Sequence, residues 1–468
     1  DITYEGLFYD YYFDTGSTKE CKSLFCPSYS LAVSPDPFSD KKEYYMSVGL
    51  NSGLKESDFQ RKKLNLVVVL DISGSMSSPF DNYYYDQFGN YVEKPQEERS
   101  DKTKIEIAKE SIVAMLDKLN SDDRFGMVLF DDQAYLGKPL SLVEDMDMEK
   151  IKAHILKIEP QNSTNMEAGF KMGTDLFDEF INADKDQYEN RIMLLTDAMP
   201  NTGRIGSNDL LDMTSGNSDK GIYSTFIGIG VDFNTQLIED ITKIKGANYY
   251  SVKSAKEFKN RLDDEFDFMV TPLVFDLNLK FKSEGWEIEK VYGSPEANES
   301  SGELMRINTL FPSKAEDGQT KGGIVILKLK KVSNSPGIKL SLSYIDRNEK
   351  GFSTEEDINF DPEQREFYGN SGIEKGIVLA RYVNLMKNWI KSEIGDEIIP
   401  LNTYRDIGIP IPEPILGQWE RQSINLNVSK QYKELLIDFR KYLNNEIEKL
   451  GDESLSNEID ILDKLISL

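Results

Sequence analysis

Hydrophobic and polar positions follow three different patterns along this chain of 468 residues. In residues 1–60, apolar residues alternate with polar ones, as at Tyr44, Met46, Val48 and Leu50. A period of two is typical of strands with one buried face, so this segment predicts antiparallel strands. Because two or three such strands are barely stable alone, we expect their pairing partners elsewhere in the chain.

Residues 61–268 have a different pattern, in which apolar runs of strand length alternate with stretches of helical spacing. The expected strands are 64–71, 125–130, 191–196, 222–229 and 248–252. The expected helices are 101–119, 147–158, 166–183, 208–215, 234–244 and 255–268. This alternation predicts an α/β domain built on a doubly wound parallel sheet with helices on both faces.

The period of two returns in residues 269–362, where Leu273, Phe275, Leu277 and Leu279 begin an alternating run. Such runs predict a β-sandwich. The strands of residues 1–60 would complete it, so we expect the α/β domain to be inserted in the sandwich. In residues 363–468, apolar residues recur at helical spacing and predict a C-terminal helical region.

The apolar run from Leu64 to Leu70 is nearly unbroken, which is typical of a central strand buried on both faces. It ends at Asp71, and Ser73 and Ser75 follow in a loop of small residues. Open α/β sheets bind their ligands at the carboxyl ends of their strands. One carboxylate and two hydroxyls there are hard oxygen ligands that suit Mg²⁺, Mn²⁺ or Ca²⁺.

Two further segments bring polar side chains to the same expected edge. Thr164 lies in Ser163-Thr164-Asn165, just before a predicted helix that contains Gly169, and Asp197 ends the apolar strand 191–196. The sheet would therefore gather two carboxylates and three hydroxyls at one point.

This order of motifs, Asp71-Ile72-Ser73-Gly74-Ser75, then Thr164, then Asp197, resembles the metal-ion-dependent adhesion site of von Willebrand factor A-type domains. The layout also resembles inter-α-trypsin inhibitor heavy chains, integrin β subunits and prokaryotic surface proteins. The resemblance implies a module for adhesion or assembly. It would bind Mg²⁺, or Mn²⁺ or Ca²⁺, and the cation would capture an Asp or Glu of a partner protein. We expect the two serines and the threonine to bind the cation directly, and the two aspartates partly through water.

The charge of the chain argues against two classes of partner, and its hydropathy argues against a membrane-spanning segment. The chain has 81 acidic and 55 basic residues, for a formal charge of −26. Nucleic acids and anionic membranes both require positive charge, so neither is expected as the main partner. The sequence has no apolar run of about 18 residues, so we expect no membrane-spanning segment.

The two cysteines, Cys21 and Cys26, lie close together in a loop that contains serine and proline. They are candidates for a disulfide, which would indicate an oxidising compartment and a secreted or cell-surface protein. Two free thiols are the alternative. Free thiols would favour a second hypothesis, an intracellular scaffold that works with a partner ATPase, as in magnesium chelatase-like systems.

Catalysis has little support in the sequence. His154 is the single histidine, and the chain has neither a His-Glu-x-x-His zinc motif nor a P-loop. A metal-dependent hydrolase is therefore the weakest of the three hypotheses, and we expect a binding protein that is not an enzyme.

Residues 78–100 form an insertion directly after the first metal-binding loop. The segment is polar and rich in tyrosine, and it is too long for a plain connector. We expect Tyr83, Tyr84 and Tyr85 to contribute to partner binding, because tyrosine offers a large contact area with a polar tip. A second cation held by Asp81 and Asp86 is a further hypothesis. A loop without a role is the alternative.

Overall fold

The structure is a computed structural model of the whole chain. It describes all residues except 1, 16–20, 40, 55–58, 81–82, 86–90, 94–101, 162, 182–186, 198–206, 230–239, 253–261, 263–264, 313–319, 322 and 395–426.

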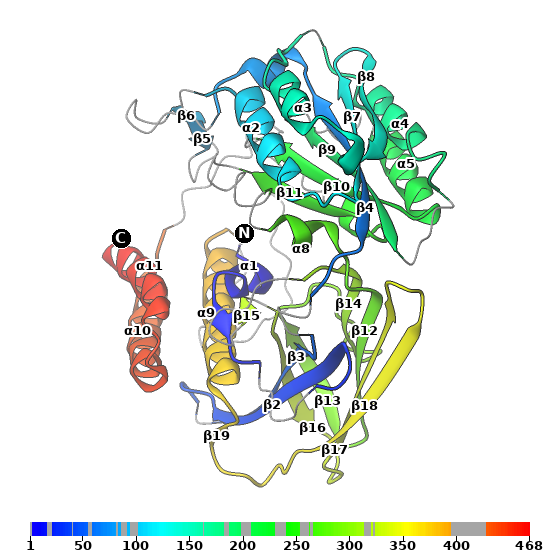
Figure 1. The fold of residues 1–468 in the computed structure, drawn as a ribbon. Coiled ribbons are helices and arrows are strands. Elements are labelled where there is room, and N and C mark those ends of the chain that lie inside the picture. Colours follow the sequence, from blue (N-terminus) through cyan, green and yellow to red (C-terminus); the bar gives the residue numbers. More distant parts are fainter. Residues whose placement is uncertain are drawn as a thin grey trace.

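A six-stranded sheet forms the α/β domain (Figure 1). Its strands, in sheet order, are β11 (Asn248–Val252), β10 (Ile222–Ile229), β9 (Tyr188–Thr196), β4 (Lys63–Asp71), β7 (Arg124–Phe130) and β8 (Ala134–Leu142). The first five are parallel, whereas β8 pairs antiparallel with β7 at the edge. The apolar run that begins at Leu64 therefore lies at the centre of the sheet, as its composition predicts.

Helices cover both faces of this sheet, which explains why β4 is apolar at successive positions. The helices α2 (Lys104–Leu116) and α3 (Met148–Ile155) cover one face, and α4 (Met166–Asp175) and α5 (Ser207–Asp219) cover the other. Leu66, Val68 and Leu70 share a core with α2 and α3. Val67 and Val69 share a second core with α4 and α5. The short helix α8 (Phe266–Val270) joins the first of these cores.

Strand β8 corrects the expectation of a purely parallel sheet. Tyr135 and Leu136 are 41% and 52% exposed, and Pro139 lies within the strand. An edge strand need not alternate in hydrophobicity and tolerates proline, so the pattern does not mark it. The expected helix 166–183 also ends earlier, at Asp175, and the expected helices 234–244 and 255–268 lie mostly outside the described residues.

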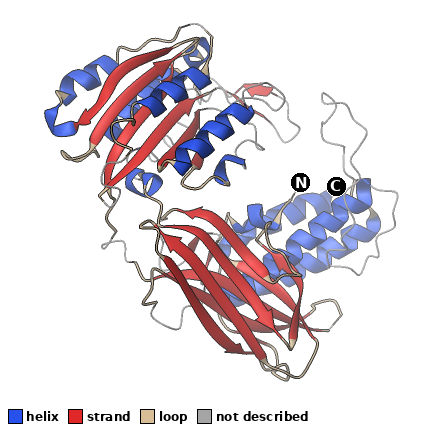
Figure 2. Ribbon diagram, turned by 90° about the vertical axis from the view of Figure 1, so that its right-hand side faces the viewer, coloured by secondary structure: helices blue, strands red, loops and turns tan. Residues whose placement is uncertain are grey.

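Two antiparallel sheets form the β-sandwich (Figure 2). One sheet contains, in order, β14 (Glu303–Leu310), β12 (Val274–Ser283), β17 (Gly337–Asp346) and β18 (Gly351–Asn359). The other contains β13 (Trp286–Tyr292), β16 (Val325–Lys331), β3 (Lys42–Ser52), β2 (Phe25–Pro35) and β19 (Phe367–Tyr368). Strands β3 and β16 are neighbours, with Val48 opposite Val325 and Met46 opposite Leu327. The predicted fold class, an α/β domain inserted in a β-sandwich, is confirmed.

Helices form a third layer on the outer face of the second sheet. They are α1 (Tyr4–Phe8), α9 (Ser371–Ile394), α10 (Lys430–Leu450) and α11 (Ser456–Ser467). Ala32, Tyr45 and Ile326 point from the sheet into a core that they share with these helices. The predicted C-terminal helical region is therefore present and packs on the sandwich. No helix among the described residues is both long enough and apolar enough to cross a membrane.

Two small pairs of strands lie outside the three larger sheets. Strand β1 (Tyr12–Phe13) pairs with β15 (Thr320–Lys321), and β5 (Tyr83–Tyr85) pairs with β6 (Tyr91–Glu93) beside α2. A disulfide joins Cys21 to Cys26, the second residue of β2, with 5.8 Å between the two Cα atoms.

An ion pair connects the two ends of the inserted domain. Arg61, just before β4, donates to Asp267 of α8 at 2.7 Å and to both oxygens of Asp123 at 2.9 and 2.6 Å. The segments that enter and leave the domain are thus fixed together on the side that faces the sandwich (Figure 1). The limits 61–268 and 269–362 stay predictions. Because α8 extends to Val270 and packs in the α/β core, an excised domain should end at residue 271.

Candidate metal centre

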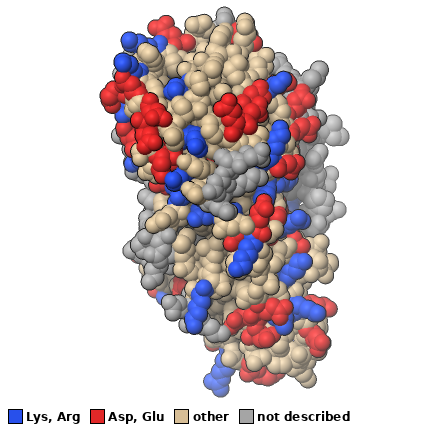
Figure 3. Space-filling model, turned by 45° about the vertical axis from the view of Figure 1, so that its right-hand side comes forward, with Lys and Arg blue, Asp and Glu red and all other residues tan. Residues whose placement is uncertain are grey.

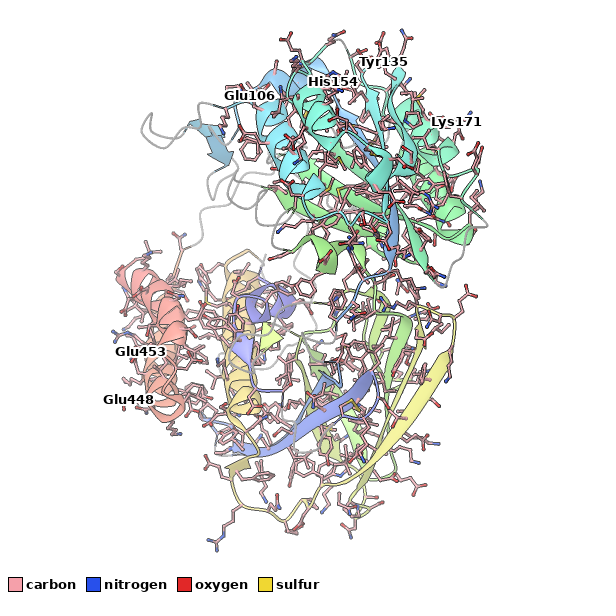
Figure 4. All side chains as sticks on the ribbon, in the orientation of Figure 1. Glu106, Tyr135, His154, Lys171, Glu448 and Glu453 are labelled. Carbon is pink, nitrogen blue, oxygen red and sulfur yellow. A yellow bond between two sulfur atoms is a disulfide. The ribbon has the colours of Figure 1, made fainter. Side chains whose placement is uncertain are left out.

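Neighbouring strands bring the first and third predicted loops together at the carboxyl edge of the sheet. Asp71 ends β4 and lies opposite Phe130 of β7, while Leu70 lies opposite Leu195 of β9. Thr196 and Asp197 therefore follow directly beside Asp71. This edge is the end of the domain away from the sandwich, where Figure 4 labels Glu106 of α2 and Tyr135 of β8.

Hydrogen bonds connect four of the five predicted metal-binding side chains. The amide of Ser73 donates to Oδ1 of Asp71 at 2.8 Å, and the hydroxyl of Thr196 donates to Oδ2 of Asp71 at 2.5 Å. The hydroxyl of Ser75 donates to Oδ1 of Asp197 at 2.7 Å. The hydroxyls of Ser73 and Ser75 are 3.1 Å apart. Asp71, Ser73, Ser75 and Asp197 thus form one continuous polar cluster.

The first loop keeps this shape because a short 3₁₀ helix, Gly74–Ser77, follows the strand. Met76 is fully buried in the core beneath it, and its amide donates to the carbonyl of Ser73 at 3.0 Å. One apolar anchor therefore holds the loop, while Ser75 stays exposed at the surface. The cluster is open to solvent on the side of Ser75 and closed on the side of Asp71.

Thr164 lies in the second loop, which hydrogen bonds fix beside the first. The amide of Gln161 donates to the carbonyl of Ile72 at 2.6 Å, and the amide of Asn165 donates to the carbonyl of Asp131 at 2.5 Å. Asn165 also caps α4 by accepting from the amide of Ala168 at 3.2 Å. Thr164 is exposed, and no hydrogen bond among the described residues joins its hydroxyl to the other four side chains.

Glycine at position 169 lets α4 approach the sheet closely behind this loop. A Cβ atom there would lie 2.6 Å from the ring of Phe130, which is the last residue of β7. The Gly169 noted in the sequence therefore serves the packing of the helix that carries Thr164 at its entrance.

Burial raises the pKa of Asp71 above its usual 3.8, and hydrogen bonds from Ser73 and Thr196 offset only part of this rise. The side chain is fully buried, and the donors to its two oxygens are neutral groups. A buried carboxylate without a cationic partner is costly to ionise. The electrostatics at Asp71 therefore favour an added cation.

Lys104 is a residue of this cluster that the sequence reasoning missed. It is the first residue of α2, and its ammonium donates to Oδ2 of Asp197 at 2.8 Å. The two side chains are 13% and 2% exposed. The sequence carried no clear signal for it, because a lysine in the first turn of a helix is only mildly unfavourable.

Asp131 was missed as well, although it follows the apolar strand 125–130 as Asp71 follows its own strand. It is fully buried, and its Oδ1 accepts from the amide of Gln133 at 3.0 Å. Its carbonyl holds Asn165 of the second loop. Asp131 thus positions the loop that carries Thr164.

The donor set fits a hard divalent cation. Asp71 and Asp197 supply carboxylate oxygens, and Ser73, Ser75 and Thr164 supply hydroxyls, with neither nitrogen nor sulfur among them. Mg²⁺, Mn²⁺ and Ca²⁺ all prefer such oxygens. No group of three or more His, Cys, Asp or Glu side chains suitable for a metal occurs among the described residues, so hydroxyls would have to complete the coordination.

The remaining predicted site residues lie in the insertion after the first loop. Asp81 and Asp86 lie outside the described residues. Tyr83, Tyr84 and Tyr85 form β5, whose backbone pairs with β6 near the start of α2. The roles of these five residues stay predictions.

Comparisons with known proteins give a family match within the α/β domain. Residues 66–200 match the model of the von Willebrand factor type A domain family. The human inter-alpha-trypsin inhibitor heavy chain H4 is 23% identical over 228 residues, and its mouse counterpart has the same identity over the same length. The match covers 48% of this chain but only 22% of the human protein.

Among solved structures, a von Willebrand factor type A protein from Catenulispora acidiphila aligns with a TM-score of 0.45 and 14% identity, covering 82% of this chain and 84% of that one. The ArnB paralog VWA2 from Sulfolobus acidocaldarius aligns with a TM-score of 0.38 and 13% identity, covering 95% and 97%.

Domains of the matched family are mostly non-catalytic protein-binding modules, and many bind divalent cations. The match begins in β4, includes the first two loops and continues past Asp197. The chain therefore contains a von Willebrand factor type A domain, which the match places at residues 66–200.

Proposed function

We propose that this chain binds a partner protein through a divalent cation, which captures an Asp or Glu side chain of the partner. The observation that carries the proposal is the cluster of Asp71, Ser73, Ser75 and Asp197, joined by hydrogen bonds at the open edge of the sheet. The loop of Thr164, hydrogen-bonded to the first loop, would add a fifth oxygen ligand.

The roles of the residues follow from their chemistry and burial. A bound cation would supply an open coordination position for a carboxylate from outside. Two carboxylates and three hydroxyls leave a divalent ion well held without fully satisfying its coordination. Ser75 is exposed and Asp71 is buried, so a partner would reach the cation from the side of Ser75. The hydroxyls of Ser73 and Ser75 lie 3.1 Å apart, and that of Ser75 donates to Asp197, an arrangement suited to holding a cation, and binding without catalysis fits it.

We place the protein outside the cell or on its surface. The disulfide between Cys21 and Cys26 supports this, because such bonds persist in oxidising compartments. Acidic side chains spread over the face shown in Figure 3, with lysine and arginine between them. That face offers no continuous basic surface for nucleic acid or anionic lipid, and a protein partner fits it better.

Isothermal titration calorimetry with Mg²⁺ and Mn²⁺ tests the cation site. The change Asp71→Ala should lower affinity by roughly 100-fold or more, because it removes one of two carboxylates. The matched control is Asp175→Ala, which removes an exposed carboxylate at the other end of α4 and should leave affinity unchanged. Equal Mn²⁺ affinity of the Asp71→Ala variant and the wild type would refute the site.

Capture of the partner from native material tests the function itself. Capture should be lost in EDTA, return with added Mg²⁺ or Mn²⁺, and fail with the Asp71→Ala variant. Deletion of residues 81–98, which keeps the buried Phe80, should spare cation affinity and weaken capture, since we assign partner selection to the insertion with Tyr83, Tyr84 and Tyr85. Capture that survives both EDTA and Asp71→Ala would contradict the proposed function.

A further inference from the structure

The ion pair between Lys104 and Asp197 gives the metal centre an internal counter-ion. We propose that the Lys104 ammonium occupies the cation-binding carboxylate in the metal-free protein and must be displaced when the cation binds. Lys104 would thereby lower the intrinsic cation affinity and make cation binding depend on the partner. This inference rests on the proposed function and adds a regulatory element to the same site.

Every carboxylate oxygen of the cluster already has a donor from the protein. Asp71 accepts from the amide of Ser73 and the hydroxyl of Thr196, and Asp197 accepts from the hydroxyl of Ser75 at one oxygen. The second oxygen of Asp197 accepts from Lys104 at 2.8 Å. Lys104 is the only charged donor among these four, so it is the group with which a cation competes most directly.

The backbone of Lys104 is fixed beside the first loop. Thr103 and Glu106 form a capping box at the start of α2, in which the amide of Thr103 donates to Glu106 at 2.7 Å. The amide of Lys104 itself donates to the carbonyl of Ser78 at 3.0 Å. The helix therefore presents the ammonium to Asp197 from a rigid base, and only the side chain has to move for a cation to enter.

Helix electrostatics indicate that this placement serves the cluster rather than the helix. Positive charge in the first turn of a helix opposes the helix dipole and is mildly destabilising there. What stabilises the lysine at this position is its ion pair with Asp197, whose side chain is 2% exposed. A buried carboxylate with a charged partner is much less costly than one without.

The charge balance links the cation to the partner. With both aspartates ionised, the cluster carries two negative charges, and Lys104 reduces this to one. A divalent cation neutralises the two aspartates and leaves the displaced Lys104 ammonium without its carboxylate, so an outside carboxylate is favoured once the cation has bound. Cation and partner should therefore each raise the affinity of the other, as linkage requires.

Calorimetry with Mn²⁺ alone tests the competition. Lys104→Met keeps the aliphatic length and removes the charge, so it should bind Mn²⁺ roughly tenfold or more tightly than the wild type. Lys104→Arg keeps the charge and should stay within about threefold of the wild type. The matched control is Lys102→Met, two residues before Lys104. It removes an exposed charge that is paired with Glu110 and should leave Mn²⁺ affinity unchanged.

A crystal structure of the wild type with Mn²⁺ gives a second measurement that needs no variant. The anomalous signal locates the ion, and the Lys104 ammonium should have left Asp197. A Lys104–Asp197 hydrogen bond that persists beside bound Mn²⁺ would overturn the inference even if the Lys104→Met variant fails to fold.

The outcomes separate this inference from the proposed function. Equal Mn²⁺ affinity in the wild type and the Lys104→Met variant overturns the counter-ion and leaves the cation site standing. Binding by the variant alone supports the counter-ion and contradicts a cation-dependent function of the wild type. Absence of binding in both overturns both ideas.

Discussion

Two buried carboxylates in this molecule have opposite electrostatic settings. Asp71 at the metal edge is fully buried, and Glu43 between the sandwich and α9 is 6% exposed. Burial raises the pKa of Asp71 above its usual value. Burial also acts on Glu43, but the positive charges of Lys328 and Arg381 outweigh it and lower its pKa.

The difference lies in the partners. Glu43 accepts from the ammonium of Lys328 at 2.5 Å, the guanidinium of Arg381 at 3.0 Å and the hydroxyl of Tyr45 at 2.7 Å. These partners lie on β16, α9 and β3, so regular secondary structure fixes all of them. The hydrogen bonds described for Asp71 come from neutral groups, among them the amide of Ser73 and the hydroxyl of Thr196.

This contrast separates a structural carboxylate from one suited to a ligand. The charge of Glu43 is compensated within the protein, and the cluster connects strands β3 and β16 of the sandwich to helix α9. At the metal edge, Lys104 compensates Asp197, and Asp71 is left without a cationic donor. A buried acid with a raised pKa at the carboxyl end of a strand is therefore the better indicator of a site.

The largest expected difference is between the α/β domain and the C-terminal part of the sandwich when each is expressed alone. Residues 61–271 contain both α/β cores and should fold alone, whereas residues 269–362 lack β2, β3 and α9 and should not fold. Without β3, strand β16 loses a hydrogen-bonded neighbour. Without α9, Ile326 of β16 becomes exposed to solvent. Amide dispersion in NMR spectra of the two fragments measures this. A well-dispersed spectrum from 269–362 would contradict a shared sandwich.

Substitution of the two carboxylates should give the next largest effect. Glu43→Ala should lower the free energy of unfolding by about 3–5 kcal/mol, because it leaves buried Lys328 and Arg381 without their anion. Asp71→Asn in metal-free protein should leave stability unchanged or raised, since it removes a carboxylate that is costly to ionise. Urea denaturation followed by circular dichroism measures both.

The control for Glu43 is Glu355→Ala, which removes an exposed ion pair with Lys339 at 2.8 Å and should have little effect. If Glu43→Ala behaves like this control, the ionic cluster beneath α9 has no structural role.

The smallest expected effect is that of acidification. Cation binding at Asp71 and the stabilisation by Glu43 should be lost at different pH values. Because its folded pKa is lowered, Glu43 stabilises the protein fully above its ordinary value of 4.5. This contribution is lost only as the pH falls through the lowered pKa. A proton competes with a cation at Asp71 from higher pH, because the pKa of Asp71 is raised.

Mn²⁺ affinity should therefore decline on acidification from neutral pH toward 4.5 while the circular dichroism of the fold stays constant. Simultaneous loss of cation binding and of the folded signal would show that the two carboxylates are not electrostatically distinct.

The central strand and the first loop could be predicted because their signals are local. The apolar run from Leu64 to Leu70 has no solvent-facing positions, and Asp71, Ser73 and Ser75 follow within five residues. The parallel sheet then determines that Asp197 lies beside Asp71, because β4 and β9 are neighbours.

Features that depend on distant partners could not be predicted in the same way. Lys104 acquires its role from a carboxylate 93 positions away, and its own neighbourhood reads as an ordinary helix start. Strand β3 is buried on both faces, and its second face is likewise buried by a distant part of the chain. Tyr45 and Ser47 are buried although they alternate with the inward positions, and Tyr45 is covered because helices pack on the outer side.

The link between Arg61 and Asp267 has a mechanical consequence. Both ends of the inserted domain are fixed at one side, and the metal edge lies at the other, so β4 runs from the junction to the loop of Asp71. Tension applied by a captured partner would run along β4, parallel to its axis. The hydrogen bonds to β7 and β9 would then bear the load together in shear rather than opening one after another. Under the proposed function, this geometry would direct force from the partner contact to the sandwich along the strands of the sheet.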